Sequence, residues 1–379
     1  MAAVPAVVLA VVAEPGLSVN LRWLLLHMHL GADTTGQVFL LLTSLLWLLA
    51  GLFARGYLTN DSRAPQFFGY FALAMMGNIG LVLSQDMAGF YTFFALMSLA
   101  SYPLIIHRRD ATALRAGRVY VWLVIAGEVV LLAGILLTMV AQESLLFGTG
   151  MKDLTSSPAM TWICGLILIG FGIKAGLVPL HVWLPVAHPA APTPASGVLI
   201  GAMIEAGMLD WLRFLPVGDA ALPGWGHLCL IAGLITAFYG VVVGVTQRNA
   251  KTVLAYSSVS QMGLIILGIG GGLLAPSSWP AGLAAVLIFA LHHGLSKGCL
   301  FLSVGVAPAA AGRSWRGRLM RVGLVIPALA LAGAPLTTGA ISKGALKDSL
   351  AALPGHWTAA LAWLLPLASV GTTLLMARF

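Results

Sequence analysis

The chain has 379 residues, of which 59% are hydrophobic and only 8% are charged, and its formal net charge is +8. Soluble domains carry about 25% charged residues, so a chain this poor in charge cannot cover a surface that faces water on every side. The composition therefore excludes a soluble globular protein and predicts an all-α integral membrane protein.

The helices are predicted from the lengths of the apolar stretches, because a bilayer-spanning helix needs about 20 apolar residues. The first segment, residues 1–13, lacks the basic start of a signal peptide and is expected to be a short helix. Eleven further stretches are apolar and long enough to cross: 37–54, 67–84, 87–106, 118–140, 160–180, 193–215, 225–246, 252–272, 280–305, 322–345 and 357–377. Together these segments predict about twelve transmembrane helices.

The basic residues of the loops predict which ends of the helices face the cytoplasm. If the loop 107–117 is cytoplasmic, strict alternation places twelve basic residues on that side: Arg55, Arg63, Arg108, Arg109, Arg115, Arg118, Arg248, Lys251, Arg313, Arg316, Arg318 and Arg321. The opposite side receives four: Arg22, Lys152, Arg213 and Lys347. This asymmetry follows the positive-inside rule, so we expect both termini on the cytoplasmic side of the cell (inner) membrane. It also argues against nucleic acid as a partner.

Two segments interrupt the helical pattern. Residues 176–194 contain five prolines, which remove backbone donors and clash with the preceding turn. Residues 333–340 read Gly-Ala-Pro-Leu-Thr-Thr-Gly-Ala. Non-helical backbone at membrane depth is tolerated where protein or a water-filled cavity satisfies it, and paired broken helices mark the ion path of many transporters. The alternative is ordinary proline kinks with re-entrant loops.

Ionisable residues inside the predicted spans are candidates for function, because a charge at the bilayer centre costs about 2.5–3.5 kcal/mol. The candidates for a proton relay are Glu128, Lys174, Glu205, His292, His293, Lys297 and Lys343. Asp210 lies nearer to a helix end, so we expect it at the membrane interface.

The placement of the lysines and histidines favours proton transfer. Lys174 directly precedes the first interruption and Lys343 directly follows the second. A lysine removed from water can exchange its proton near neutrality, and a carboxylate that moves beside it would switch that exchange. His293 and Lys297 share one helix face, next to His292, and histidine passes protons along water chains. The alternative for a histidine in an apolar helix is a hydrogen-bonded packing role.

Three residues are predicted to give protons access to the relay: His181 and His188, which border the first interruption, and Lys251. For the two histidines a cap or a loop contact is an equal alternative. The three cysteines match no metal or redox spacing, and the glycine-rich stretch 268–272 follows no predicted strand, so it is not a dinucleotide site. We therefore expect no catalytic residues, no cofactor and no metal in this chain, and no redox chemistry of its own.

Several motifs resemble one family, the antiporter-like membrane subunits of respiratory complex I, of membrane-bound hydrogenases including formate hydrogenlyase, and of multisubunit Mrp sodium/proton antiporters. The longest match is Lys-Ala-Gly-Leu-Val-Pro-Leu-His-Val-Trp-Leu-Pro at 174–185, continued by Ala-His-Pro-Ala-Ala-Pro-Thr-Pro at 187–194. Further matches are 254–263, His293 to Lys297 with Phe301-Leu302, and Ser342-Lys343, in the same order as in the family.

The resemblance implies two inverted five-helix repeats, each with a broken helix, and a central hydrophilic axis of lysine, histidine and glutamate. It implies N-terminal transmembrane helices in 1–66, a first repeat in 67–215 broken near 176–194, and a second in 216–379 broken near 333–340. Lys174 matches the central lysine of the first repeat and Lys343 that of the second. His293 and Lys297 match the residues that bridge them.

Three positions depart from the family pattern. Alanine stands at Ala95, where the family usually has the glutamate that partners the lysine matching Lys174. Glu205 stands where the family usually has lysine, and Glu128 occupies a position expected to be uncharged. We hypothesise that Glu205 or Glu128 replaces the missing partner. The alternative is a scaffold subunit that has lost its pumping half-channel.

The resemblance predicts a proton-translocating subunit of a multisubunit energy-coupling complex, such as an NADH:quinone oxidoreductase-like or hydrogenase-like translocase whose redox steps belong to other chains. The expected partners are the lipid bilayer, other membrane subunits and protons, with sodium ions as a further candidate. The alternatives are a subunit of a secondary sodium/proton antiporter, the membrane subunit of an inorganic-carbon uptake complex with a zinc-containing soluble protein, and a non-pumping scaffold.

Overall fold

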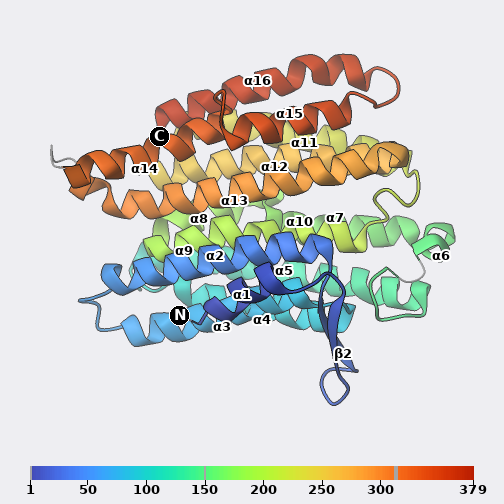
Figure 1. The fold of residues 1–379 in the computed structure, drawn as a ribbon, viewed down its shortest axis with the longest axis horizontal. Helices are drawn as coiled ribbons and strands as arrows, with labels where there is room; N and C mark the ends of the chain where they lie inside the picture. The colour runs from blue at the N-terminus through green and yellow to red at the C-terminus, as the bar shows by residue number, and fades with distance from the viewer. Residues whose placement is uncertain (1, 149–150, 311–314) are drawn as a thin grey trace.

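The fold is a bundle of long helices that run nearly parallel to one direction (Figure 1). The computed structural model describes residues 2–148, 151–310 and 315–379. The helices of the first half are α1 (Val4–Val12), α2 (Thr34–Tyr57), α3 (Ala64–Leu83), α4 (Met87–Ile105), α5 (Ala111–Gln142), α6 (Met151–Ser156), α7 (Met160–Ala175), α8 (Leu184–Ala190), α9 (Thr193–Val198) and α10 (Ile204–Phe214). Those of the second half are α11 (Pro223–Gly244), α12 (Ala250–Leu274), α13 (Trp279–Ala310), α14 (Trp315–Ala332), α15 (Thr338–Leu350) and α16 (Trp357–Arg378).

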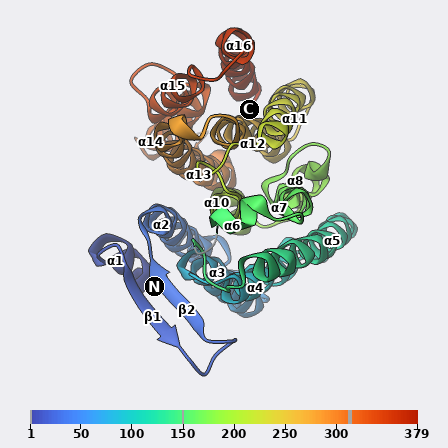
Figure 2. The ribbon, with the colours of Figure 1, turned by 90° about the vertical axis from the view of Figure 1, so that its right-hand side faces the viewer.

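The two halves of the chain meet along the middle of the bundle. Viewed along the helices, α2–α5 lie on one side and α11, α12 and α14–α16 on the other, with α10 and α13 between them (Figure 2). The helices at this junction are enclosed by protein, whereas outer helices expose large apolar side chains such as Trp122 on α5 and Trp363 on α16. Such exposed apolar faces fit a lipid surround.

Ten helical segments of the described residues are long and apolar enough to cross a membrane. The predicted stretch 322–345 is divided between α14 and α15, which are separated at 333–337. The first segment differs from a spanning helix: α1 has nine residues, about 14 Å at 1.5 Å per residue, against about 30 Å of hydrocarbon. Arg313, one of the basic loop residues, lies outside the described residues.

A β-hairpin precedes α2, and the all-α prediction did not include it. Its strands β1 (Leu17–Leu21) and β2 (Met28–Ala32) pair antiparallel, with Leu17 opposite Ala32. The backbone N–H of Gln85 donates to the carbonyl of His29 at 2.8 Å, which ties the hairpin to the α3–α4 loop. The hairpin lies at the same end of the bundle as α6, and the last turn of α2 and the C-terminus lie at the other end (Figure 1).

Acidic residues at helix starts act as caps. Asp33, Asp86 and Asp110 each accept a hydrogen bond from the backbone N–H three residues later, at 2.7–3.0 Å. A side-chain oxygen in this position satisfies one of the free N–H groups of the first turn. These three acids therefore have a structural role, unlike the carboxyl groups that lie inside the helices.

Both interruptions begin at a glycine in the left-handed region. Gly176 has φ +75° after α7, and Gly333 has φ +85° after α14. The N–H of the next residue reaches back to the last turn of its helix, from Leu177 to the Gly172 carbonyl at 2.9 Å and from Ala334 to the Leu329 carbonyl at 3.0 Å. This is the glycine C-cap that ends many helices, so the two predicted breaks are confirmed as true helix ends.

Candidate functional site

Lys174 lies in the last turn of α7 with its ammonium buried in protein. The residue is 3% exposed, and its Nζ donates to the Ser98 Oγ of α4 at 3.1 Å. The Nζ also lies 5.6 Å from the ring centroid of Phe94 and 6.0 Å from that of Tyr120. Aromatic faces attract a cation, but an ammonium has three N–H donors and only one of them meets a side-chain acceptor here. The group can therefore exchange its proton with another partner.

Glu128 of α5 faces the same small space as Lys174. The residue is 8% exposed, and its Oε1 has no hydrogen-bond partner. Glu128, Ser98 and Lys174 line a cavity of about 10 Å³, close to the minimum volume for one water molecule. The four ion pairs found among the described residues do not include Lys174 with Glu128. A single bridging water is therefore the contact that this geometry accommodates.

Glu205 of α10 pairs instead with His293 of α13, and both are fully buried. Glu205 Oε1 contacts His293 Nδ1, while the His293 Nε2 lies 3.3 Å from the Ser258 Oγ of α12. The other Glu205 oxygen, Oε2, has no partner. The pair therefore joins the two halves of the chain and leaves one carboxyl oxygen open to a further donor.

Two glycines and a π-helical turn make this pairing possible. Residues Leu199–Met203 form π-helix, which shifts the face that the following residue presents. A Cβ on Gly201 would lie 2.8 Å from the Gly294 carbonyl oxygen, and one on Gly294 would lie 2.6 Å from the Gly201 oxygen. Only glycine fits at both positions, so the two backbones approach closely enough for Glu205 to reach His293.

The remaining candidates on α13 point to two different neighbours. Lys297 is fully buried, and its Nζ donates to the Leu254 carbonyl at 2.7 Å and to the Ser257 Oγ, both on α12. His292 Nδ1 lies 2.9 Å from the Thr338 Oγ1 at the start of α15, and its Nε2 has no partner. The sequence therefore placed these groups correctly on one helix, and the structure directs them to α12 and α15.

Lys343 of α15 is half-buried and contacts the end of the preceding helix. Its Nζ donates to the carbonyls of Leu331 at 2.9 Å and of Ala332 at 3.2 Å, the last two residues of α14. A cation is favoured there because the free carbonyls at a helix C-terminus carry partial negative charge.

Two of the predicted access residues meet where α8 packs on α12. The Lys251 Nζ, at the start of α12, donates to the Ala191 carbonyl at 2.8 Å and to the Ser196 Oγ at 3.3 Å. His188 is fully buried, neither of its ring nitrogens has a partner, and its ring centroid lies 5.1 Å from that of Phe301 on α13. The two residues therefore lie where the end of α8 meets the first turn of α12.

The third predicted access residue, His181, lies against a different pair of helices. Its ring centroid lies 4.9 Å from that of Tyr239 on α11 and 6.1 Å from that of Tyr256 on α12. Its Nδ1 has no hydrogen-bond partner. The structure therefore brings His188 and Lys251 together at the contact of α8 with α12 and leaves His181 in a separate aromatic setting.

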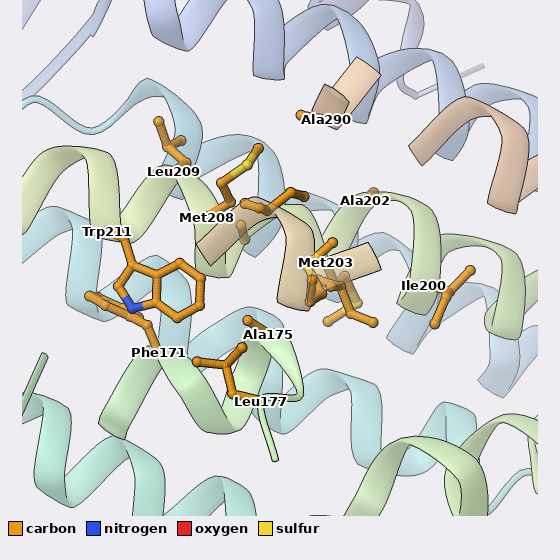
Figure 3. Packing of buried hydrophobic residues seen from close by; sticks show 14 of the residues in the cluster. Phe171, Ala175, Leu177, Ile200, Ala202, Met203, Met208, Leu209, Trp211 and Ala290 are labelled. Atoms are coloured by element: carbon orange, nitrogen blue, oxygen red, sulfur yellow. The ribbon is translucent and has the colours of Figure 1, made fainter. Parts of the chain in front are cut away.

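Asp210 lies near the end of α10, as expected, but it was not selected as a buried candidate, and neither was Arg213. Asp210 is fully enclosed by protein, and neither carboxyl oxygen has a partner. The reason is that α10 is covered to its end. Figure 3 shows Met208 and Trp211 of α10 in one packed cluster with Phe171 of α7. The sequence contained one signal that could have linked these two residues: Asp210 and Arg213 are three residues apart, which places both on one helix face.

Comparison with known proteins agrees with this architecture. The family described as "NADH:quinone oxidoreductase/Mrp antiporter, TM" matches residues 84–374, and the chain belongs to this family. It is 31% identical over 284 residues to Hydrogenase-4 component B of Escherichia coli, covering 72% of this chain and 42% of that protein. It is 29% identical over 338 residues to Na(+)/H(+) antiporter subunit A1 of Staphylococcus aureus, covering 84% of this chain and 42% of that protein.

Two solved structures share the fold. A chain of the Mrp complex from Dietzia sp. DQ12-45-1b superposes with a TM-score of 0.83 at 23% identity, covering 100% of this chain and 71% of that one. A chain of the membrane-bound sulfane sulfur reductase, an archaeal respiratory membrane complex, gives 0.83 at 22% identity, covering 99% and 78%. The protein is therefore a multi-pass, antiporter-like membrane subunit, and it spans less than half the length of the curated relatives that it matches.

Proposed function

We propose that this chain translocates protons as a membrane subunit of a multisubunit energy-coupling complex in the cell (inner) membrane, with both termini cytoplasmic. The observation that carries the proposal is the fully buried Glu205–His293 pair, which joins ionisable groups of the two halves. A charge-bearing pair at this depth is expensive to bury and persists where it has a task.

The proposed path runs across the bundle, from the first half of the chain to the second. It consists of Lys174 with Glu128, then Glu205 with His293, then Lys297, His292 and Lys343. Protons enter from the end at which Lys251 and His188 lie. Where hydrogen bonds are missing, as at Glu205 Oε2 and at the ring nitrogens of His188, water molecules complete the chain.

The geometry supports Glu128, rather than Glu205, as the substitute for the carboxylate absent at Ala95. Glu128 shares a cavity with Lys174, whereas one oxygen of Glu205 is already engaged by His293. In this proposal the two acids at positions where the family usually has none have separate roles. Glu128 switches the protonation of Lys174, and Glu205 couples the two halves of the chain. The proposed repeats, 67–215 and 216–379 after N-terminal helices in 1–66, meet at the Glu205–His293 pair.

The test measures proton flux through the purified complex in proteoliposomes, with a pH-sensitive dye inside the vesicles. Lys174→Met and Glu205→Gln are each expected to reduce the flux, and Lys347→Met, which removes an exposed cation of α15, is the control. Flux at the level of the unmodified complex in both relay variants would reject the proposal in favour of a scaffold role.

A second candidate function is a subunit of a secondary sodium/proton antiporter, because one relative carries that name. The proteins that co-purify with the chain distinguish the two. Iron–sulfur and quinone-site subunits would support the redox-driven complex, small Mrp-type subunits would support the antiporter, and a zinc protein would support inorganic-carbon uptake. Sodium dependence of the flux is the matching functional measurement.

A further inference from the structure

A second set of ionisable residues leads away from the relay toward the end of the bundle that carries the β-hairpin. Asp210 is fully buried on α10, and neither of its carboxyl oxygens has a hydrogen-bond partner. An isolated carboxylate is costly to bury, so this group must hold a proton or contact water for much of its lifetime. The relay proposed above does not use it.

Asp210 lies between the relay and the surface. It follows Glu205 by five residues, about 7.5 Å along the helix at 1.5 Å per residue, and it precedes Arg213 by three. Helix α10 packs closely on the end of α7 that carries Lys174, since a Cβ on Gly207 would lie 3.2 Å from the Ala175 backbone nitrogen. Asp210 follows Gly207 by three residues and shares its helix face.

Arg213 connects the region around Asp210 to the protein surface. Its Nη2 donates to the Asp33 Oδ1 at 3.1 Å and to the Val82 carbonyl at 2.9 Å, and its Nη1 contacts the Ser84 carbonyl. The Arg213 side chain is 6% exposed, whereas that of Asp33 is 48% exposed. Solvent therefore reaches this ion pair from the Asp33 side.

Asp210 is not needed to neutralise Arg213. Asp33 already forms the ion pair with that guanidinium, and the ion pairs among the described residues do not include Asp210 with Arg213. A purely structural counter-charge would be expected to contact its cation directly. The unpartnered carboxyl between two cations fits a group that takes up and releases protons.

Phenylalanine rings occupy the remaining space between the two cations. From Lys174 the line runs through Phe94, Phe171, Phe214 and Phe147 to Arg213, with successive ring centroids 5.0–5.6 Å apart. Such an apolar barrier excludes ions and bulk water. A proton that crosses this region therefore needs a titratable side chain within it, and Asp210 supplies one.

We propose that Asp210 is the outlet carboxyl of the first half of the chain, an inference that rests on the proposed proton transport. The Lys174 ammonium transfers its proton to the Asp210 carboxylate, which leaves a neutral amine and a carboxylic acid. The acid then releases the proton to water at the Arg213–Asp33 pair. Entry at Lys251 and exit at Asp33 thus lie at opposite ends of the bundle.

The test compares two variants of the complex in proteoliposomes, each with one carboxylate converted to an amide. Asp210→Asn is expected to lower the proton flux about tenfold or more, because a proton-transferring side chain is lost. Asp219→Asn is the matched control, since Asp219 is exposed and follows α10 at the same end. Its flux is expected to equal that of the unmodified complex.

The outcomes separate this inference from the proposed function. Unmodified flux in Asp210→Asn together with reduced flux in Lys174→Met would overturn the outlet and leave proton transport standing. Unmodified flux in both would overturn both.

A conservative variant separates proton transfer from a structural role at Asp210. Asp210→Glu keeps a titratable carboxyl group, so its proton flux is expected to exceed that of Asp210→Asn. Flux as low in Asp210→Glu as in Asp210→Asn, in complexes of equal thermal stability, would overturn the outlet.

Discussion

The two broken helices end in the same way, but the lysines beside the two breaks make different contacts. At the first break, the Ile173 carbonyl at the end of α7 accepts from the Trp183 indole N–H at 2.7 Å. At the second, the last carbonyls of α14 accept from Lys343 itself. A neutral indole therefore satisfies the first helix end and leaves the Lys174 ammonium free to face Ser98 and Glu128. Lys343, by contrast, stabilises a helix end, and in the proposed relay it also carries a proton.

The two lysines beside the breaks therefore differ in the protein contacts that each would lose with its proton. Lys174 is held by a hydroxyl and aromatic rings and faces a water-sized cavity, so loss of its proton breaks few protein contacts. Loss of the Lys343 proton would weaken two charge-assisted hydrogen bonds at a helix C-terminus. Proton release in the second half is therefore expected to loosen the α14–α15 junction.

The largest expected effect comes from removing the link between the two halves. Glu205→Gln keeps the size of the side chain but removes the charge that stabilises a proton on His293, so proton flux is expected to fall about tenfold or more. The measurement is dye-detected flux in proteoliposomes, with Glu14→Gln as an exposed-acid control. Equal flux in the two variants would mean that the halves are not coupled through this pair.

The next largest effect is on the stability of the folded protein, and it is expected to differ between substitutions of the two lysines. Lys343→Met leaves two carbonyls at the end of α14 without a donor, which costs about 1.5–3 kcal/mol for hydrogen bonds to a charged group. Lys174→Met loses one such bond and places an apolar side chain among aromatic rings, so it is expected to cost less. Thermal unfolding of the detergent-purified complex measures both, with Lys347→Met as the control on α15. An equal loss in the two variants would contradict the division of roles.

A smaller effect concerns the glycines at which the breaks begin. Alanine at either position must adopt a left-handed conformation, which costs about 1–2 kcal/mol. Gly176→Ala is expected to be worse than Gly333→Ala, because its Cβ would lie 2.1 Å from the Leu184 Cδ1, while the nearest atom at Gly333 is the Lys343 Cδ at 3.2 Å. Thermal unfolding again measures the difference. The reverse order would show that the second break is the more rigid one.

The smallest effect lies outside the membrane spans, in the α2–α3 loop. The backbone N–H of Arg63, and after it His107, hold the pKa of Asp61 below its usual 3.8. A carboxyl whose pKa is lowered by folding stabilises the folded state above its unfolded value, and that contribution is lost as the pH falls through the folded value. We therefore expect the loop to loosen below about pH 4.

Hydrogen exchange of residues 58–63 across acidic pH measures this loosening. Asp61→Asn is expected to remove the pH dependence, because the amide does not titrate, while Asp110→Asn, a cap at the neighbouring loop, serves as the control. An unchanged pH dependence in Asp61→Asn would assign it to another group.

The sequence by itself determined the membrane class, the position of both breaks and the identity of the lysines beside them. These features are local: glycine and proline end a helix through their own backbone, and helical periodicity places His293 and Lys297 on one face. The resemblance then predicted the family correctly, because its longest motif surrounds the first break.

Only the tertiary structure decided which carboxyl group meets which cation. The sequence left Glu128 and Glu205 as equal substitutes, did not show that protein encloses Asp210, and contained no signal that we recognised for the hairpin. Each of these depends on helices that are distant in sequence but adjacent in space. The close approach of Gly201 and Gly294 after a π-helical turn brings Glu205 to His293, and the packing of α5 on α7 brings Glu128 to Lys174. Backbone distances between helices are set by packing, and no local pattern encodes them.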